Sequence, residues 1–278
     1  MGKLYGLIGY PIGHSMSPLM HNNEFSQLEM PNYYQAFNVE PSQLEHAVTG
    51  MRALGISGFN VTIPHKVAVM DFLDVIDEEA ASIGAVNTIV NHDGQLIGYN
   101  TDGQGYLQSL LTITGESLQG KSILVIGAGG AARAIVTSIA RHGVKTIDIT
   151  NRTSEKAEEM SKHALKFATS KSLTLQQAEE ALNEYDVVIN TTSVGMSPNV
   201  DDIPLSLHNL REGTILSDLI YNPLKTKWLT IGEEKGAIID NGVSMFVGQG
   251  ALSFKKWTGV EPNQARMKKI VEETLGGR

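Results

Sequence analysis

The sequence contains no cysteine, which excludes disulfide bonds and thiolate metal ligands and fits a reducing cytoplasm. It has no excess of basic residues either, because 22 lysines and arginines against 30 aspartates and glutamates give a formal net charge of −8. Binding to nucleic-acid phosphates or to an anionic membrane surface is therefore not expected. No apolar run is long enough to span a membrane, and the run from Leu4 to Ile8 is too short for a signal peptide. We expect a cytoplasmic protein with no nucleic acid, membrane or metal among its ligands.

The chain has the composition of a globular protein of more than one domain. Its 278 residues are 41% hydrophobic and 19% charged, and this length suits two domains better than one core. Short apolar runs typical of strands alternate with amphipathic segments, which predicts the α/β class. The expected strands are residues 4–9, 33–39, 58–61, 85–90, 95–99, 122–126, 144–150, 186–190, 214–218 and 237–240. The expected helices begin near residues 18, 41, 64, 77, 103, 127, 154, 175, 226 and 241, with a last one after Pro262.

The central stretch of the chain reads as a strand, a glycine turn, a helix and a second strand. The turn contains Gly127, Ala128, Gly129, Gly130 and Ala131, and Ala132 takes the third position of a G-x-G-x-x-G/A pattern. Glycines at these positions let the backbone approach a pyrophosphate, which is then bound at the positive end of the helix. The alternative is a glycine turn used only for packing. Because the pattern lies inside a complete strand–helix–strand unit, it predicts a Rossmann dinucleotide-binding domain.

The end of the second strand indicates which dinucleotide binds. An NAD site has a carboxylate at this position, which accepts hydrogen bonds from the ribose hydroxyls. This strand has no acidic residue there and ends in Asn151, Arg152 and Thr153. The guanidinium of Arg152 offers a planar set of donors to a 2′-phosphate, with its neighbours as neutral donors. These residues could also serve only to cap the helix that begins near Ser154. We favour NADP as the cofactor.

The first half of the chain carries hydroxyls and a lysine at the ends of predicted elements. Ser15 and Ser17 precede Pro18, where a helix should begin, and they could cap that helix or bind a carboxylate. Pro64 should start another helix and place Lys66 in its first turn, at the carboxyl end of a strand. The helix dipole disfavours a cation there, whereas an adjacent Asp102 would stabilise it, and the sequence does not decide between the two.

Several separate motifs, in this order and along nearly the whole chain, closely resemble the shikimate dehydrogenase family. The motifs are Ser15-Met16-Ser17-Pro18, Asn60-Val61-Thr62-Ile63-Pro64-His65-Lys66, Gly84-Ala85-Val86-Asn87-Thr88, Gly98-Tyr99-Asn100-Thr101-Asp102-Gly103, the glycine turn, Asn151-Arg152-Thr153 and Gly248-Gln249-Gly250. The resemblance implies reduction of 3-dehydroshikimate to shikimate with NADPH, in the pathway to aromatic amino acids. It also implies a substrate domain at residues 1–112, an NADP-binding Rossmann domain at 113–240, and C-terminal helices at 241–278 that return to the first domain.

The resemblance also implies roles for single residues. Lys66 and Asp102 would be catalytic. The substrate carboxylate would be held by Ser15 and Ser17, and the substrate hydroxyls by Thr62, Asn87, Asp102 and Gln249, with Lys66 and Tyr221 as further substrate contacts. The pyrophosphate would lie on Gly127 to Ala131 and the adenosine phosphate on Asn151 to Thr153. The other expected cofactor contacts are Glu78, Leu219 and Gly242.

Two alternatives stay open at this stage. One is a quinate/shikimate dehydrogenase with broader substrate choice or with NAD as cofactor. The other is an NADP-sensing Rossmann protein without catalysis, which would need no Lys66 and Asp102 pair. The sequence is compatible with a monomer or a homodimer.

Overall fold

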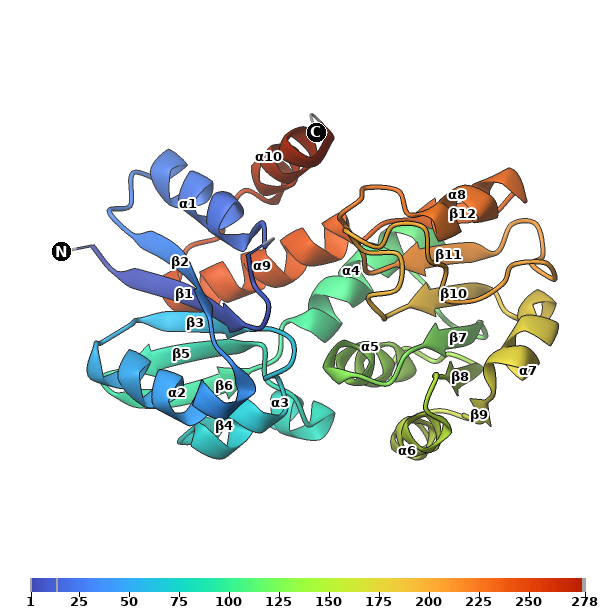
Figure 1. Ribbon diagram of the computed structural model, residues 1–278, viewed down its shortest axis with the longest axis horizontal. Helices are drawn as coiled ribbons and strands as arrows, with labels where there is room; N and C mark the ends of the chain where they lie inside the picture. The colour runs from blue at the N-terminus through green and yellow to red at the C-terminus, as the bar shows by residue number, and fades with distance from the viewer. Residues whose placement is uncertain (1, 14, 277–278) are drawn as a thin grey trace. The chain divides into compact units, whose positions relative to one another are not determined.

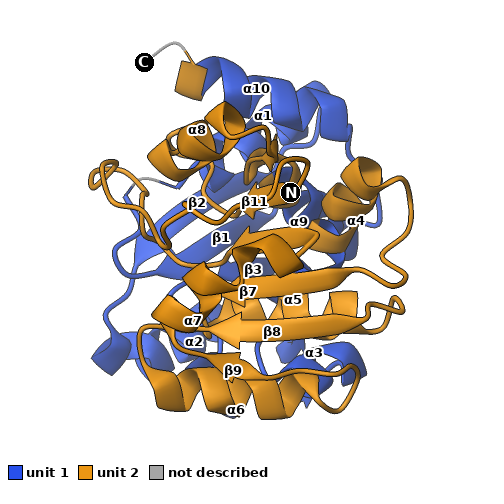
Figure 2. Cartoon of the chain, turned by 90° about the vertical axis from the view of Figure 1, so that its right-hand side faces the viewer, with its two compact units in different colours: residues 1–105, 247–274 blue, residues 106–246, 275–278 orange. Residues whose placement is uncertain are grey.

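The computed structural model describes residues 2–13 and 15–276 and divides the chain into two compact units (Figure 2). Unit 1 comprises residues 1–105 and 247–274, and unit 2 comprises residues 106–246 and 275–278. The C-terminal segment therefore returns to the unit that contains the N-terminus, as the sequence predicted. Both units are α/β.

Unit 1 is built on a mixed six-stranded sheet. Its strand order is β2 (Tyr33–Asn38), β1 (Leu4–Gly9), β3 (Gly58–Val61), β5 (Thr88–His92), β6 (Gln95–Tyr99) and β4 (Val75–Ile76). Strand β1 is parallel to both of its neighbours, whereas β3, β5 and β6 pair in antiparallel fashion. The sequence did not predict β4, because two residues are too few to show an alternating pattern.

Helices cover both faces of this sheet (Figure 1). They are α1 (Ser17–Gln27), α2 (Leu44–Ala53), α3 (Glu78–Ile83), the first turn of α4 (Asp102–Thr114), most of α9 (Val243–Thr258) and α10 (Gln264–Gly276), together with the short helices η1 (Pro41–Gln43) and η2 (Ala68–Phe72). On one face Val48 and Met51 of α2 pack in an aliphatic core with Ile8 and Phe59. On the other face Tyr5 stacks between aromatic rings of α1 and α9. Side chains of β1 therefore point alternately into two separate hydrophobic cores.

Two predicted helix starts in unit 1 were wrong. Helix α1 begins at Ser17, with Met16 at the N-cap position and no side-chain capping bond. The helix expected at Pro64 does not form, and η2 begins only at Ala68. The chain turns instead, because the His65 N–H donates to the Thr62 carbonyl and the Lys66 carbonyl accepts from the Val86 N–H. Lys66 therefore does not lie at the positive end of a helix dipole.

Unit 2 is a doubly wound parallel sheet with the strand order of a Rossmann fold. The order is β9 (Ser172–Leu173), β8 (Thr146–Thr150), β7 (Ser122–Ile126), β10 (Val187–Asn190), β11 (Ile215–Asp218) and β12 (Ile238–Asp240). All five pairings are parallel. Besides most of α4, the helices of this unit are α5 (Gly130–Ala140), α6 (Ser154–Ala164), α7 (Leu175–Glu180), the short η3 (Leu182–Glu184) and α8 (Lys227–Glu234). The predicted strand–helix–strand unit is confirmed as β7, α5 and β8.

The two faces of the unit 2 sheet explain why its strands are continuous apolar runs. Ile123 and Val125 of β7 pack on one face with Ile135 and Ile139 of α5. Leu124 points to the opposite face, in a core that contains Trp228 of α8. Because both faces are covered by helices, every β7 residue after Ser122 is buried.

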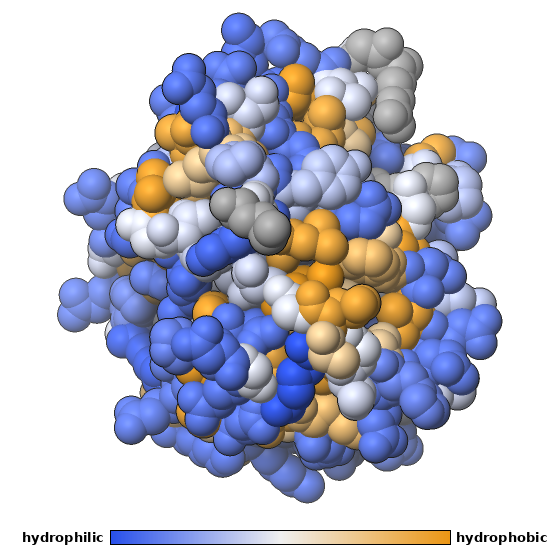
Figure 3. Space-filling view, turned by 90° about the vertical axis from the view of Figure 1, so that its left-hand side faces the viewer, coloured by the Kyte–Doolittle hydropathy of each residue, from blue (hydrophilic) through white to orange (hydrophobic). Residues whose placement is uncertain are grey.

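The surface carries both polar and apolar side chains. Figure 3 shows hydrophobic residues gathered near the centre of one face, within a mostly hydrophilic surface. Large apolar side chains of unit 1 that are exposed include Tyr33 (56%) and Leu54 (80%). Among the described residues, no helix is long and apolar enough to cross a bilayer.

Candidate active site

A lysine and an aspartate distant in the sequence form an ion pair in unit 1. The Lys66 Nζ lies 2.5 Å from the Asp102 Oδ2, and the two side chains are 14% and 5% exposed. At this burial, water screens the pair weakly, so the attraction between the two charges is stronger than in a surface pair. The ammonium of Lys66 can carry a proton, and the carboxylate of Asp102 balances its charge.

The Asp102 carboxylate is held at the start of a helix. Asp102 is the first residue of α4, where the helix dipole favours a negative charge. Its Oδ1 accepts a hydrogen bond from the Asn87 Nδ2 at 2.8 Å, and its main-chain N–H donates to the Asn100 Oδ1 at 3.0 Å. Both carboxylate oxygens therefore have a donor, Lys66 on one and Asn87 on the other.

The backbone around Lys66 is tied to the same region. Its carbonyl accepts from the Val86 N–H at 2.8 Å, one residue before Asn87. The neighbouring His65 is buried and its Nε2 donates to the Val39 carbonyl at 2.7 Å. The turn is thus anchored on both sides of Lys66, which directs its side chain to the α4 N-terminus.

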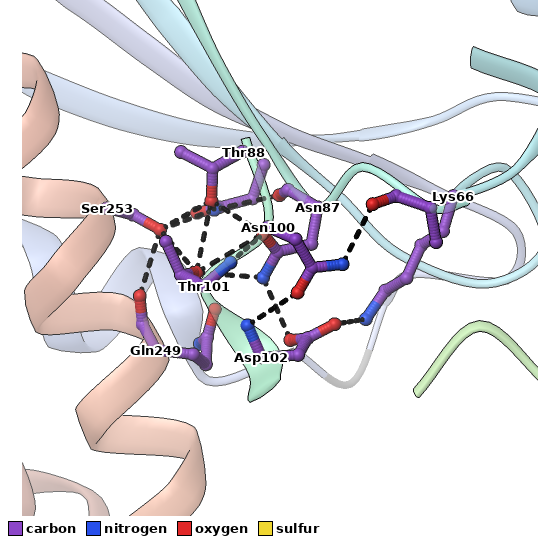
Figure 4. Close-up of polar contacts among 10 residues, drawn as sticks. Lys66, Asn87, Thr88, Asn100, Thr101, Asp102, Gln249 and Ser253 are labelled. Atoms are coloured by element: carbon purple, nitrogen blue, oxygen red, sulfur yellow. Dashed lines mark hydrogen bonds and ion pairs between the residues drawn. The ribbon is translucent and has the colours of Figure 1, made fainter. Parts of the chain in front are cut away.

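A buried polar network lies behind the ion pair (Figure 4). The Asn87 Nδ2 also donates to the Thr101 Oγ1, and the Asn87 Oδ1 accepts from the Thr101 N–H at 2.8 Å. The Thr88 hydroxyl lies 2.9 Å from the Asn87 Oδ1 and 2.7 Å from the Ser253 Oγ. The sequence assigned no role to Thr88, Thr101 or Ser253. Thr88 and Thr101 stand in family motifs and meet through the β5–β6 hairpin, whereas no local pattern marks Ser253, which joins them only when α9 packs on the sheet.

The other predicted substrate residues of unit 1 are two serines at the start of α1, a threonine after β3 and a glutamine within α9. The Ser15 Oγ accepts from the Ser17 N–H at 3.2 Å, and Ser17 is buried. Thr62 follows β3, and its N–H donates to the Ile8 carbonyl at 2.9 Å. Gln249 is on α9, and its carbonyl accepts from the Ser253 hydroxyl at 2.9 Å. The hydroxyls and amides expected to bind substrate are therefore all on elements of one unit, except for Tyr221.

In unit 2, the glycine turn has the geometry that a phosphate site needs. Gly127 has φ +114°, and a Cβ there would lie 2.3 Å from the Thr191 Oγ1, so only glycine fits. Gly129 is the extended N-cap residue of α5, and a Cβ on it would meet no atom within 4 Å. Open space thus lies over the N-terminus of an 11-residue helix. Gly130 and Ala131 are its first two residues, and Ala128 packs partly buried beside the core.

The three residues after β8 lead into α6, whose N-terminus has no side-chain cap. Thr153 is the N-cap residue of α6, but its side chain makes no capping bond. The Asn151 Nδ2 donates to the Thr153 carbonyl at 3.0 Å, and Arg152 is exposed. Capping therefore does not account for the Thr153 hydroxyl, and the donors of this turn fit a phosphate.

The remaining predicted contacts of unit 2 lie close together. A Cβ on Gly242 would lie 2.1 Å from the Leu219 carbonyl oxygen, so the two segments approach each other as only glycine allows. Tyr221 packs on Phe246 with ring centroids 4.4 Å apart. Glu78, the last predicted contact, is the exposed first residue of α3 in unit 1.

Asp218, beside Leu219, is a buried carboxyl group that the sequence reasoning missed. Burial raises its pKa to about 6, against the lowering effect of hydrogen bonds from the Ile220 N–H, Thr226 and Asn190. These bonds fix the backbone where β11 ends and the segment to Tyr221 begins. Its role is to hold the end of β11, at the sheet edge where open α/β folds place ligands.

Within residues 2–13 and 15–276, no cluster of three or more His, Asp or Glu side chains has the arrangement of a metal site. Unit 1 holds an ion pair with a polar network, and unit 2 holds an open glycine turn in a doubly wound sheet. A dinucleotide fold together with a group that can exchange a proton defines the class of nicotinamide-dependent dehydrogenases.

Three family models match successive parts of the chain. They describe a shikimate dehydrogenase substrate binding domain (residues 7–89), a shikimate/quinate 5-dehydrogenase (109–199) and a shikimate 5′-dehydrogenase C-terminal domain (242–272). The NADP(+) shikimate dehydrogenase of Geobacillus sp. (strain WCH70) is 56% identical over 277 residues, which cover 100% of both chains.

Solved structures agree with this match. A shikimate dehydrogenase crystallised with NADP+ is 43% identical, with a TM-score of 0.91 over 99% of this chain and 96% of the other. The enzyme of Thermus thermophilus, in complex with NADP(H) and shikimate, is 32% identical, with a TM-score of 0.88 over 98% and 100% of the two chains. The chain belongs to the shikimate dehydrogenase family.

Proposed function

We propose that this chain catalyses the reversible reduction of 3-dehydroshikimate to shikimate by NADPH, with Lys66 exchanging the proton. The chain is an NADP-dependent oxidoreductase of the shikimate pathway, which leads to the aromatic amino acids. The observation that carries the assignment of Lys66 is its 2.5 Å contact with Asp102. NADP, when bound, supplies or accepts the hydride.

The ion pair suits both directions of the reaction. Reduction of a ketone needs a proton for the developing alkoxide, and the ammonium of Lys66 carries one. In the reverse direction the alcohol must lose a proton, which the coupled Lys66–Asp102 pair can take up. The Asn87 amide, which donates to Asp102, keeps the carboxylate turned toward Lys66.

The substrate residues are assigned by their chemistry. Ser15 and Ser17 lie at the N-terminus of α1, where hydroxyls and backbone N–H groups suit the substrate carboxylate. Thr62, Asn87, Asp102 and Gln249 would bind the hydroxyls, and Lys66 and Tyr221 would be further substrate contacts. We retain residues 1–112 as the substrate domain, 113–240 as the NADP domain and 241–278 as the returning helices.

The cofactor residues are assigned in the same way. The pyrophosphate would lie on Gly127 to Ala131 at the open start of α5, and the 2′-phosphate on Asn151, Arg152 and Thr153. Leu219 and Gly242 would line the nicotinamide, and Glu78 would be a further contact. We also propose that the protein is cytoplasmic and that it is a monomer or a homodimer.

Replacing Arg152 tests the choice of dinucleotide. We expect Arg152→Ala to raise the KM for NADPH by about 10-fold to 100-fold, because a charge-assisted bond contributes roughly 1.5–3 kcal/mol. The KM for NADH should change less than about twofold, since NADH has no 2′-phosphate. Steady-state kinetics with both cofactors measure this. Lys156→Ala removes an exposed cation on the following helix and should leave both values unchanged; equal losses for both cofactors would contradict the assignment.

The activity itself is tested by following NADPH absorbance during titration with 3-dehydroshikimate. We expect turnover with NADPH, a much slower rate with NADH, and little reaction of NADP with quinate. Comparable rates with quinate or NADH would favour the broader quinate/shikimate enzyme. A protein that binds NADP but shows no shikimate-dependent reduction would instead be a sensor.

A further inference from the structure

Ser253 is a buried hydroxyl that joins the C-terminal helix to the network behind the ion pair (Figure 4). It lies on α9, 151 residues after Asp102 in the chain, and its exposure is 0%. Its Oγ lies 2.7 Å from the Thr88 Oγ1 and 3.2 Å from the Thr101 Oγ1. It also accepts from the Asn60 Nδ2 at 3.0 Å. Side chains from three segments of unit 1, those of Asn60, Thr88 and Thr101, therefore meet at Ser253.

The donors and acceptors around Ser253 can be assigned in one consistent way. The Ser253 hydroxyl donates to the Gln249 carbonyl, one turn earlier on α9. It shares this proton with the Thr88 Oγ1 at 2.7 Å, because the Thr88 hydroxyl itself donates to the Asn87 Oδ1, and the Ser253 oxygen accepts from the Asn60 amide. The Asn60 amide is itself oriented, because its Oδ1 accepts from the Tyr34 hydroxyl at 2.7 Å. Ser253 therefore directs the hydroxyl of Thr88.

The direction of these hydroxyls matters for Asn87. Thr88 and Thr101 both contact the Asn87 side chain, and the Asn87 Nδ2 donates to the Asp102 Oδ1. In a buried site each polar group needs its partner, so a change at one member is transmitted to the next. The path from Ser253 to the ion pair is Ser253, Thr88 or Thr101, Asn87, Asp102.

We propose that Ser253 is a positioning residue for proton transfer, which acts by orienting the Asn87 amide that holds the Asp102 carboxylate toward Lys66. This inference rests on the proposed function of the pair. It gives α9 a part in the chemistry besides the Gln249 contact with substrate. Ser253 touches neither substrate nor cofactor in this proposal.

Ser253→Ala in the full chain tests it. Losing one neutral hydrogen-bond partner in a buried network corresponds to about a fivefold to tenfold lower kcat. The KM for NADPH should stay within about twofold, because the residues proposed for the pyrophosphate and the 2′-phosphate are in unit 2. The pH profile of kcat should change as well, because a positioning residue for proton transfer alters it, whereas a purely structural loss does not.

Two further variants separate positioning from general loss of stability. Thr258→Ala removes another α9 hydroxyl that donates to the carbonyl four residues earlier, but it lies outside the network and should leave kcat and its pH profile unchanged. Ser253→Thr keeps the hydroxyl and should recover most of the lost kcat. The proposal is overturned if Ser253→Ala keeps wild-type kcat and pH profile, or if Ser253→Thr folds but is as slow as Ser253→Ala. Absence of shikimate oxidation in the wild type would instead refute the proposed function.

Discussion

Lys66→Ala is expected to lower kcat for 3-dehydroshikimate reduction by about 10²-fold to 10⁴-fold, the usual contribution of a positioned general acid. The reason is that the Lys66 Nζ, the cation 2.5 Å from Asp102, is the proposed proton donor to the developing alkoxide. The dissociation constant of NADPH should not change, because the residues proposed for its pyrophosphate and 2′-phosphate are in unit 2. Stopped-flow kinetics and a fluorescence titration with NADPH measure the two quantities separately.

A second substitution at the same position distinguishes a role of Lys66 in proton transfer from a role in balancing the charge of Asp102. Lys66→Arg keeps a cation opposite Asp102, but a guanidinium stays protonated and does not release its proton near neutral pH. We expect Lys66→Arg to be nearly as slow as Lys66→Ala. Substantial activity in the Arg variant would mean that Lys66 only balances the charge of Asp102.

The matched control for Lys66 is Lys3→Ala, which removes an exposed lysine of the same unit and should leave kcat unchanged. Removing the Lys66 ammonium also leaves the nearly buried Asp102 carboxylate without its cation. Thermal melting of each variant is therefore needed beside the kinetics. Near-normal kcat in a folded Lys66→Ala protein would end the proposal.

His21 is expected to make the protein sensitive to acid. It is fully buried on α1, and its ring stacks on Tyr34 at 4.5 Å with Phe254 and Trp257 also in contact. Burial lowers its pKa from 6.5 to about 3, because the charged imidazolium is disfavoured in this aromatic site. The unfolded chain takes up the proton below about pH 6.5, whereas the folded site does so only near pH 3.

The sign of the effect follows from these two values. The contribution of neutral His21 to stability is fully present above about pH 6.5 and is lost progressively as pH falls toward 3. At about 1.4 kcal/mol per pKa unit, the loss is about 4 to 5 kcal/mol. This is a large part of the roughly 5 to 15 kcal/mol that stabilises a typical domain.

His21→Phe tests this by removing the titrating group and keeping an aromatic ring. We expect its free energy of unfolding, measured by urea denaturation between pH 7 and pH 4, to fall less steeply with acid than that of the wild type. Any packing cost of the larger ring shifts the whole curve and not its slope. His46→Phe changes an exposed histidine in the same way and should keep the wild-type slope. Parallel curves for wild type and His21→Phe would show that His21 is not the cause.

The sequence alone determined the features that depend on neighbours in the chain. The strand at 122–126, the glycine turn after it and the helix that follows could be predicted, because apolar periodicity and the conformation of Gly127 are local properties. The family also followed from the sequence, since the motifs around Ser15, Lys66, Asp102 and Gln249 keep their order. The two-residue strands β4 and β9 were missed, because their partners and not their own sequences make them strands.

Only the tertiary structure decided how the Lys66–Asp102 pair is held. The sequence placed Lys66 in a helix, whereas bonds to Thr62 and Val86 hold that segment in a turn. Asp102 is 36 residues away, and Ser253 another 151, so their contacts with Lys66 and Thr88 arise from packing of α4 and α9 on the sheet. Hydrogen bonds between such distant residues leave no periodic trace in the chain, because each depends on where several elements meet.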